Sequence, residues 1–122
     1  MNRLGEIDSE KCISLETYKK NDQPVRTPVW FVIKENLIYV VTRSQTGKVK
    51  RLRNNKKVKI ATCTFKGKII GGWTSGTAKM LTDKEAKEAE KWRNKKYGFM
   101  AKVAKFFSKK KGEIVAFSIK LD

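Results

Sequence analysis

The sequence predicts a mainly β fold, a small antiparallel barrel with short helices. Two observations favour this class. Short segments along the whole chain alternate apolar and polar side chains, as strands with one face in a core do. The predicted helices fall between groups of strands, without the regular strand–helix–strand alternation of a parallel sheet. At 122 residues the chain fits one domain, which we expect to span residues 1–122.

The first three predicted strands follow one another through short turns. Residues 11–18 and 25–33 alternate in side-chain character, and an Asn-Asp-Gln-Pro turn separates them. Pro28 has no backbone N–H to donate to a ladder, so we expect a sheet edge, a bulge or a turn away from a partner there. The polar residues 34–36 lead into a β-branched run at 37–42, which predicts a hairpin.

A short helix and two further strands come next. Val49 and Leu52 recur at a helical interval among basic residues, which predicts a two-turn helix that ends near Asn54. Alternation resumes at residues 58–65. A Gly-Gly pair then indicates a bulge just before the strand at 73–81.

Two helical pieces and a last strand complete the predicted fold. Thr82 and Glu85 form a capping box that starts a helix, and Gly98 is a typical stop. The chain ends in a strand at 113–121 after a basic turn. The second helical piece is expected to pack through four residues at one-face spacing, Met100, Val103, Ala104 and Phe107.

The charge balance narrows the classes of partner. Lys and Arg number 29 against 12 Asp and Glu, which gives a formal net charge of +17. Such a charge attracts nucleic acid, anionic membranes and phosphorylated ligands, although a solvated basic surface explains it somewhat better than dedicated nucleic-acid binding does. No apolar run approaches the roughly 20 residues that span a bilayer, and residues 1–10 do not resemble a signal peptide. We therefore expect a soluble cytoplasmic protein without a membrane partner.

The residue types that are present also limit the chemistry. Histidine is absent, which excludes His-dependent nucleophilic triads and His-ligated zinc, and we predict no metal site. The two cysteines, Cys12 and Cys63, form no CxxC pair, so we expect small apolar residues in or near strands. An enzyme of this composition would rely on a bound cofactor for difficult chemistry.

The segment from Thr42 to Asn55 carries the strongest functional signal. It places hydroxyl groups, a glycine and several cations where a strand gives way to a helix. Free amides at a helix N-terminus and the helix dipole favour an anion, Thr46 and Ser44 can donate hydrogen bonds, and Lys48 adds a point charge. This pattern indicates a phosphate site. A basic amphipathic helix that faces water is the alternative.

Together with Arg26 to Phe31, this segment resembles the pyridoxamine-phosphate-oxidase-like split-barrel flavoproteins. It is most similar to their branch of small flavin- or deazaflavin-dependent oxidoreductases. The resemblance covers nearly the whole chain from Lys11 and implies a six-stranded antiparallel split β-barrel of the FMN-binding type. It also implies a homodimer with the coenzyme near the subunit interface. The motifs that carry it are TPVW at 27–30, T-x-x-x-S/T-x-K-V-K-R-x-R-x-N at 42–54, GTA at 76–78 and KYG at 96–98.

The resemblance also implies a set of coenzyme-binding residues. The second strand would line the coenzyme, Thr46 and Lys48 would hold its phosphate, and Lys50 would serve the phosphate or the tail. Trp30 and Trp73 have structural alternatives, a core or interface position and a glycine-flanked bulge respectively. No catalytic side chain is assigned. The candidates are Arg26, Thr27, Pro28, Val29, Trp30, Val41, Thr42, Ser44, Thr46, Gly47, Lys48, Lys50, Arg51 and Trp73.

The function implied by the resemblance is hydride transfer between coenzyme F420 or FMN and an unknown small substrate. The resemblance favours F420 slightly over FMN, and the cations at positions 43, 48, 50 and 51 are consistent with the longer anionic tail of F420. The expected partners are a second copy of the chain and a small molecule, with nucleic acid bound only non-specifically. The alternative function is a cofactor-free nucleic-acid-binding module, which would use the net charge together with Trp30, Trp73 and Trp92.

Overall fold

The computed structural model describes residues 4, 7 and 10–122, and the side chains of these residues except 105–108. Its strands are β1 (Ile13–Tyr18), β2 (Pro24–Val29), β3 (Val32–Lys34), β4 (Leu37–Arg43), β5 (Lys57–Thr62), β6 (Thr74–Met80) and β7 (Ile114–Leu121). Its helices are α2 (Gly47–Asn54), α3 (Asp83–Tyr97), α4 (Phe99–Ser108) and the 3-10 helix η1 (Lys109–Lys111).

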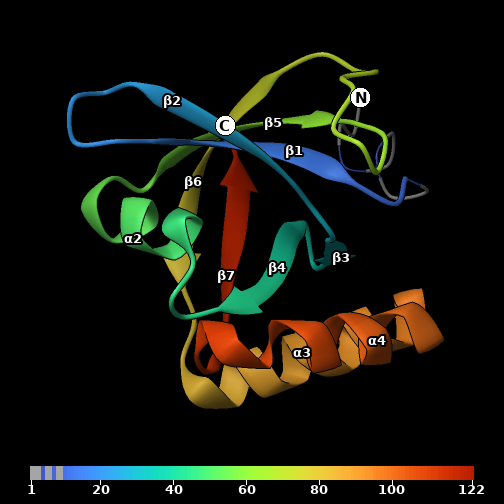
Figure 1. Cartoon of the computed structure of the whole chain (residues 1–122). Helices are drawn as coiled ribbons and strands as arrows, with labels where there is room; N and C mark the ends of the chain where they lie inside the picture. Colours follow the sequence, from blue (N-terminus) through green and yellow to red (C-terminus); the bar gives the residue numbers. More distant parts are fainter. Residues whose placement is uncertain (1–3, 5–6, 8–9) are drawn as a thin grey trace.

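The described strands form one curled sheet of the predicted mainly β class. Its seven strands have the order β2-β1-β5-β6-β7-β4-β3, and all neighbours are antiparallel. In Figure 1 the sheet is strongly curved, α3 and α4 run together along one end of it, and α2 lies apart from them beside the sheet. Among the described residues, no helix combines the length and apolarity required to cross a membrane.

The strand count differs from the predicted six because the predicted strand at 25–33 is divided. β2 ends at Val29 and β3 begins at Val32. The two parts pair at opposite edges of the sheet, β2 with β1 and β3 with β4. The expectation of an edge at Pro28 is confirmed, because β2 is an edge strand and Pro28 is opposite Ser14 of its single neighbour.

The predicted start of the long helix is confirmed at Thr82. The Glu85 backbone N–H donates to the Thr82 hydroxyl at 3.2 Å, and the Thr82 N–H donates to the Glu85 carboxylate at 3.0 Å. The helix α3 ends at Gly98, whose φ of 60° is readily adopted by glycine. The glycine pair before β6 lies outside the strand, and a side chain at Gly71 would collide with the hydroxyl of Thr62. Close approach to β5 therefore accounts for Gly71 better than a bulge does.

The packed face predicted for the second helical piece is wrong. Met100 and Val103 are exposed, whereas Ala101 is fully buried. Phe107 lies outside the residues whose side chains are described, so its predicted packing stays a prediction. The helix α4 thus buries a different stripe from the predicted one.

The core fixes the helix that carries the predicted phosphate site. Leu52 of α2 is fully buried in a cluster with Ile13 and Leu15 of β1, and Val49 is fully buried as well. This confirms the helical interval that the sequence indicated. In a second apolar cluster, Ala86 and Ala89 of α3 pack on the strand β7. Both helices are therefore anchored through apolar side chains while their polar faces remain free for other contacts.

Candidate functional site

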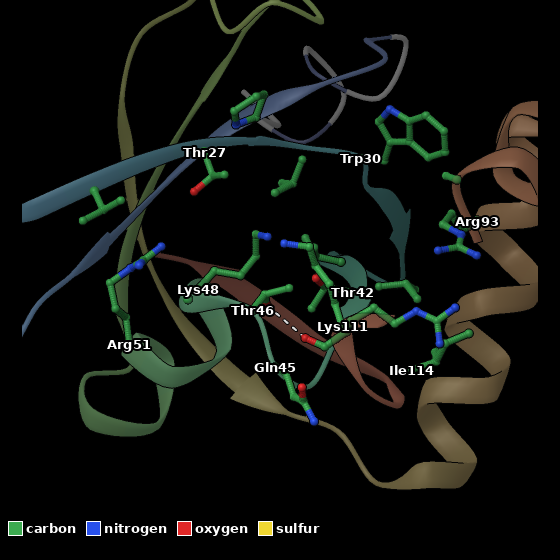
Figure 2. Close-up of a pocket in the computed structure, with 18 of the residues that line it drawn as sticks. Thr27, Trp30, Thr42, Gln45, Thr46, Lys48, Arg51, Arg93, Lys111 and Ile114 are labelled. Carbon is green, nitrogen blue, oxygen red and sulfur yellow. Dashed lines mark hydrogen bonds between the residues drawn. The ribbon is translucent and has the colours of Figure 1, made fainter. Parts of the chain in front are cut away.

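A cavity of about 660 Å³ lies between the edge strand β2, the end of β4, the start of α2 and the helices α3 and α4. Such a volume is typical of pockets for small molecules. Figure 2 shows Lys48 reaching into it from α2, with Thr27 and Arg93 on other sides. Most of the predicted site residues line it, namely Arg26, Thr27, Pro28, Val29, Trp30, Val41, Thr42, Thr46, Gly47, Lys48 and Arg51.

Three of the predicted residues do not line the cavity. The Ser44 hydroxyl accepts from the Glu113 N–H at 3.1 Å and so holds the turn to the start of β7. Lys50 is exposed on the outer side of α2. Trp73 is half-buried beneath Arg26, whose guanidinium carbon lies 4.5 Å from the indole centroid. A sequence motif gives the residue types of a segment, but the side-chain directions that separate these three became visible only in the structure.

The N-terminus of α2 makes one end of the cavity electropositive. Thr46 is the N-cap, but its hydroxyl donates to the Arg43 carbonyl at 2.9 Å and does not cap the helix. The first turn of α2 holds no acidic residue. Amides at this end therefore lack a side-chain acceptor, and the positive end of the helix dipole is not offset.

Two basic side chains of α2 extend this positive region. Burial, followed by the charges of Arg51 and Lys111, lowers the pKa of Lys48. Within the described part of the chain, the Lys48 ammonium makes no hydrogen bond or ion pair. Arg51 is fixed by its Nε, which donates to the Thr17 hydroxyl at 2.6 Å. An anion bound here would relieve the repulsion between these cations, so the arrangement suits a phosphate.

Two further polar atoms at the cavity lack partners among the described residues. The hydroxyl oxygen of Thr27 is buried and makes no hydrogen bond, and neither does Nε of Arg93. A buried polar atom without a partner costs about 1–3 kcal/mol, which a ligand could recover. Together with the cationic end and the apolar Val29 and Val41, these atoms fit a ligand that carries both a phosphate and a planar polar ring.

Arg26 differs from these groups because its charge is already compensated. Its Nε lies 3.0 Å from Oε1 of Glu16, and the Tyr18 hydroxyl donates to Oε2 of the same carboxylate at 2.6 Å. Burial raises the pKa of Glu16, but these hydrogen bonds and the charges of Arg26 and Lys59 outweigh it and hold the pKa below its usual value. Arg26 thus stabilises the fold as well as lining the cavity.

Sequence reasoning did not assign several of the lining residues. Arg93 could have been found, because it continues the buried stripe of α3 that contains Ala86, Ala89 and Tyr97. A cation at the apolar interval of a helix is unusual and points to a polar function. The lining residues that were not predicted as site residues are Val25, Val40, Arg43, Gln45, Arg93, Ala104, Lys111 and Ile114.

Solved structures share this fold. A heme storage protein from Vibrio cholerae is 16% identical, with a TM-score of 0.72 over 100% of this chain and 92% of its own. An FAD-binding protein from Mesorhizobium loti is 17% identical, with a TM-score of 0.67 over 95% and 82%. A Clostridium acetobutylicum protein related to a general stress protein, of the pyridoxinephosphate oxidase family, is 18% identical, with a TM-score of 0.67 over 94% and 78%.

At these identities the likeness establishes the shared fold. No curated protein sequence matches the chain. The family model described as pyridoxamine 5'-phosphate oxidase matches residues 4–122, which is nearly the whole sequence. The chain therefore belongs to the pyridoxamine 5'-phosphate oxidase family, as its motifs indicated.

Proposed function

We propose that this protein is an oxidoreductase that binds FMN or coenzyme F420 through the coenzyme phosphate in the 660 Å³ cavity. The observation that carries the proposal is the start of α2, where Gly47 and Lys48 line this cavity. Among the described residues, no side chain caps this helix end and the Lys48 ammonium makes no hydrogen bond or ion pair. Membership of the family and the FAD-binding relative support a flavin-type ligand over other phosphorylated molecules.

Each lining group has a separate task in this proposal. Lys48 and the first amides of α2 would hold the phosphate, with Arg51 as a fixed second charge. The hydroxyl of Thr27 would bind a polar edge of the ring, and this contact would give the hydroxyl the hydrogen-bond partner that it lacks among the described residues. A coenzyme of this kind supplies hydride transfer when bound. The chain itself would orient the ring against the apolar side chains and leave the rest of the cavity to a small substrate.

Of the two coenzymes, we favour F420 slightly. The cavity is also lined by Arg43, Arg93 and Lys111, which lie beyond the α2 site and could meet a longer anionic tail. Arg93 retains an unpartnered Nε for such a contact. FMN, with its single phosphate, would reach fewer of these side chains, of which Arg93 also lies 3.6 Å from the Glu90 carboxylate.

We further propose that two copies of the chain form a homodimer. The side chains of Phe99, Met100 and Val103 on α4 are 77%, 49% and 39% exposed. Ala104, next along the same helix, lines the cavity. A second copy packed here would bury this apolar surface beside the site. Sedimentation velocity tests the proposal, and a monomer at every concentration would refute it.

The nucleic-acid-binding alternative would use three indoles that are partly occupied by other side chains. Trp30 stacks on Tyr97, Trp92 packs on Tyr39 and Trp73 lies under Arg26, so each indole has a contact within the chain. The net charge remains as its basis. Steep salt-dependent binding to random oligonucleotides, without affinity for either coenzyme, would favour this alternative.

Titration of FMN and of coenzyme F420, followed by fluorescence, tests the coenzyme proposal. Lys48→Ala should raise the Kd roughly tenfold to a hundredfold, since a charged hydrogen bond contributes about 1.5–3 kcal/mol. Lys50→Ala is the matched control, because it removes the same charge from the same helix but lies outside the cavity. Equal effects of the two changes would show non-specific electrostatics and contradict a phosphate site at Lys48.

A further inference from the structure

The break between β2 and β3 leaves Trp30 and Phe31 without a place in the sheet. The helix α3 binds the backbone of Phe31 instead. The Phe31 N–H donates to the Tyr97 hydroxyl at 3.1 Å, and Lys96 Nζ donates to the Phe31 carbonyl at 2.9 Å. Lys96 Nζ also lies 3.8 Å from the centroid of the Phe31 ring. Both backbone groups of Phe31 are thus satisfied by two adjacent side chains of the helix.

Tyr97 connects this break to a third part of the chain. Its hydroxyl donates to the carbonyl of Lys11, just before β1, at 2.7 Å. Burial raises the pKa of Tyr97 to about 12, although its hydrogen bond with the Phe31 backbone acts in the opposite direction. The hydroxyl therefore keeps its proton near neutral pH and can donate to Lys11 while it accepts from Phe31.

Tyr97 also fixes the ring of Trp30. The two rings are stacked, with centroids 4.4 Å apart and planes at 6°. Trp30 lines the cavity, and so does Arg93, which lies one turn before Tyr97 on α3. One face of the indole is therefore covered by a side chain that is itself tied to two backbone segments.

We infer that Lys96 and Tyr97 are positioning residues that hold the Trp30 indole as a rigid wall of the coenzyme cavity. The inference rests on the proposed function, because it assumes that the cavity binds a coenzyme ring. A wall that is already ordered loses little side-chain entropy when a ligand binds, which favours affinity. The Lys96-Tyr97-Gly98 motif thereby acquires a role that the phosphate site at α2 does not explain.

Fluorine NMR of protein labelled with 5-fluorotryptophan tests the inference, because the chain has three tryptophans and each gives its own signal. Tyr97→Leu should move the Trp30 signal and leave that of Trp73 unchanged. It should raise the coenzyme Kd about twofold to tenfold, the range expected for an aromatic pair. Tyr39→Leu is the matched control: it breaks the Tyr39–Trp92 pair, which lies outside the cavity lining, and should move only the Trp92 signal.

A double-mutant cycle shows whether Tyr97 acts through Trp30. Trp30→Leu should raise the Kd about as much as Tyr97→Leu does, and the double variant should bind no more weakly than either. Additive effects would overturn the inference. If Tyr97→Leu does not fold, Tyr97→Phe keeps the stacked ring and loses the hydroxyl. The Trp30 signal of Tyr97→Phe should stay closer to the wild-type signal than that of the double variant Lys96→Met/Tyr97→Phe. Identical Trp30 signals in these two variants would overturn the inferred role of Lys96. Absence of coenzyme binding by the wild type would refute the proposed function instead.

Discussion

Replacing Arg26 by alanine would separate its role in the fold from its predicted role at the coenzyme. Its Nε lies 3.0 Å from a Glu16 carboxylate whose side chain is only 7% exposed, and its guanidinium covers Trp73. Because this charge is already compensated, a coenzyme phosphate gains little from it. We expect Arg26→Ala to lower the free energy of unfolding clearly and to change coenzyme affinity much less than Lys48→Ala.

The geometry sets the size of the effect on stability. A hydrogen bond to a charged group contributes about 1.5–3 kcal/mol, and an exposed cation–π contact about 0.5–1 kcal/mol. The Arg26 side chain is 56% exposed, so water screens part of this attraction and the expected loss falls to about 1–2 kcal/mol. The hydroxyl of Tyr18 still donates to Glu16 at 2.6 Å, so the carboxylate is not left without a partner.

The loss should depend on pH in a defined direction. The pKa of Glu16 is held below its usual 4.5 in the folded protein, partly by Arg26. Its contribution to stability is therefore fully present above pH 4.5 and is lost as the pH falls through the lower folded pKa. Removing Arg26 raises that folded pKa. The difference between wild type and Arg26→Ala should thus be largest near neutral pH and should shrink in acid.

Urea denaturation at about pH 7 and about pH 3 measures this difference, and FMN titration measures affinity in parallel. Glu16→Gln combined with Arg26→Ala is the control, because it removes the buried charge and should recover part of the lost stability. Unchanged stability of Arg26→Ala, with a rise in Kd as large as that of Lys48→Ala, would refute the reasoning and make Arg26 a coenzyme ligand.

Three further outcomes follow from single positions. In Gly76→Ala the new Cβ would lie 2.8 Å from the Lys120 carbonyl oxygen, so the free energy of unfolding in urea should fall by about 1–3 kcal/mol. Burial, and next the charges of Arg51 and Lys111, lowers the pKa of Lys48 below its usual 10.5. Coenzyme affinity should therefore weaken as pH rises through that lowered value, and calorimetry in different buffers at alkaline pH, where the free ammonium has begun to lose its proton, should show proton uptake on binding. Burial, with a smaller effect of Cys12, raises the pKa of Cys63 to about 11, so iodoacetamide should alkylate it far more slowly in folded than in unfolded protein.

The sequence predicted the local elements of this fold well because their causes are local. The apolar interval of Val49 and Leu52 places both side chains in the core, and the capping box at Thr82 forms as expected. The phosphate segment could be recognised for the same reason, since donors within one turn of a helix start are close whatever the rest of the chain does. These features depend on residues that are near one another in sequence.

What could not be predicted depends on distant contacts. The alternation at 25–33 continues through Trp30 and Phe31, and only the hydrogen bonds of Phe31 with Lys96 and Tyr97 show why the strand is interrupted there. Lys111 and Arg93 reach the cavity from segments far along the chain. Ser44 has the residue type of a phosphate ligand, yet a turn contact with Glu113 occupies its hydroxyl.

The strand break and the cavity have a common cause. Because β2 and β3 occupy opposite edges of one curled sheet, the chain must cross from edge to edge within Trp30 and Phe31. Among the described residues the free edge of β2 then has no ladder partner, and the cavity lies along it, opposite β4. Pro28 suits this edge because its missing N–H would have had no acceptor strand there. The TPVW motif therefore has two roles: it ends the strand at an open edge of the barrel, and its side chains line the cavity at that edge.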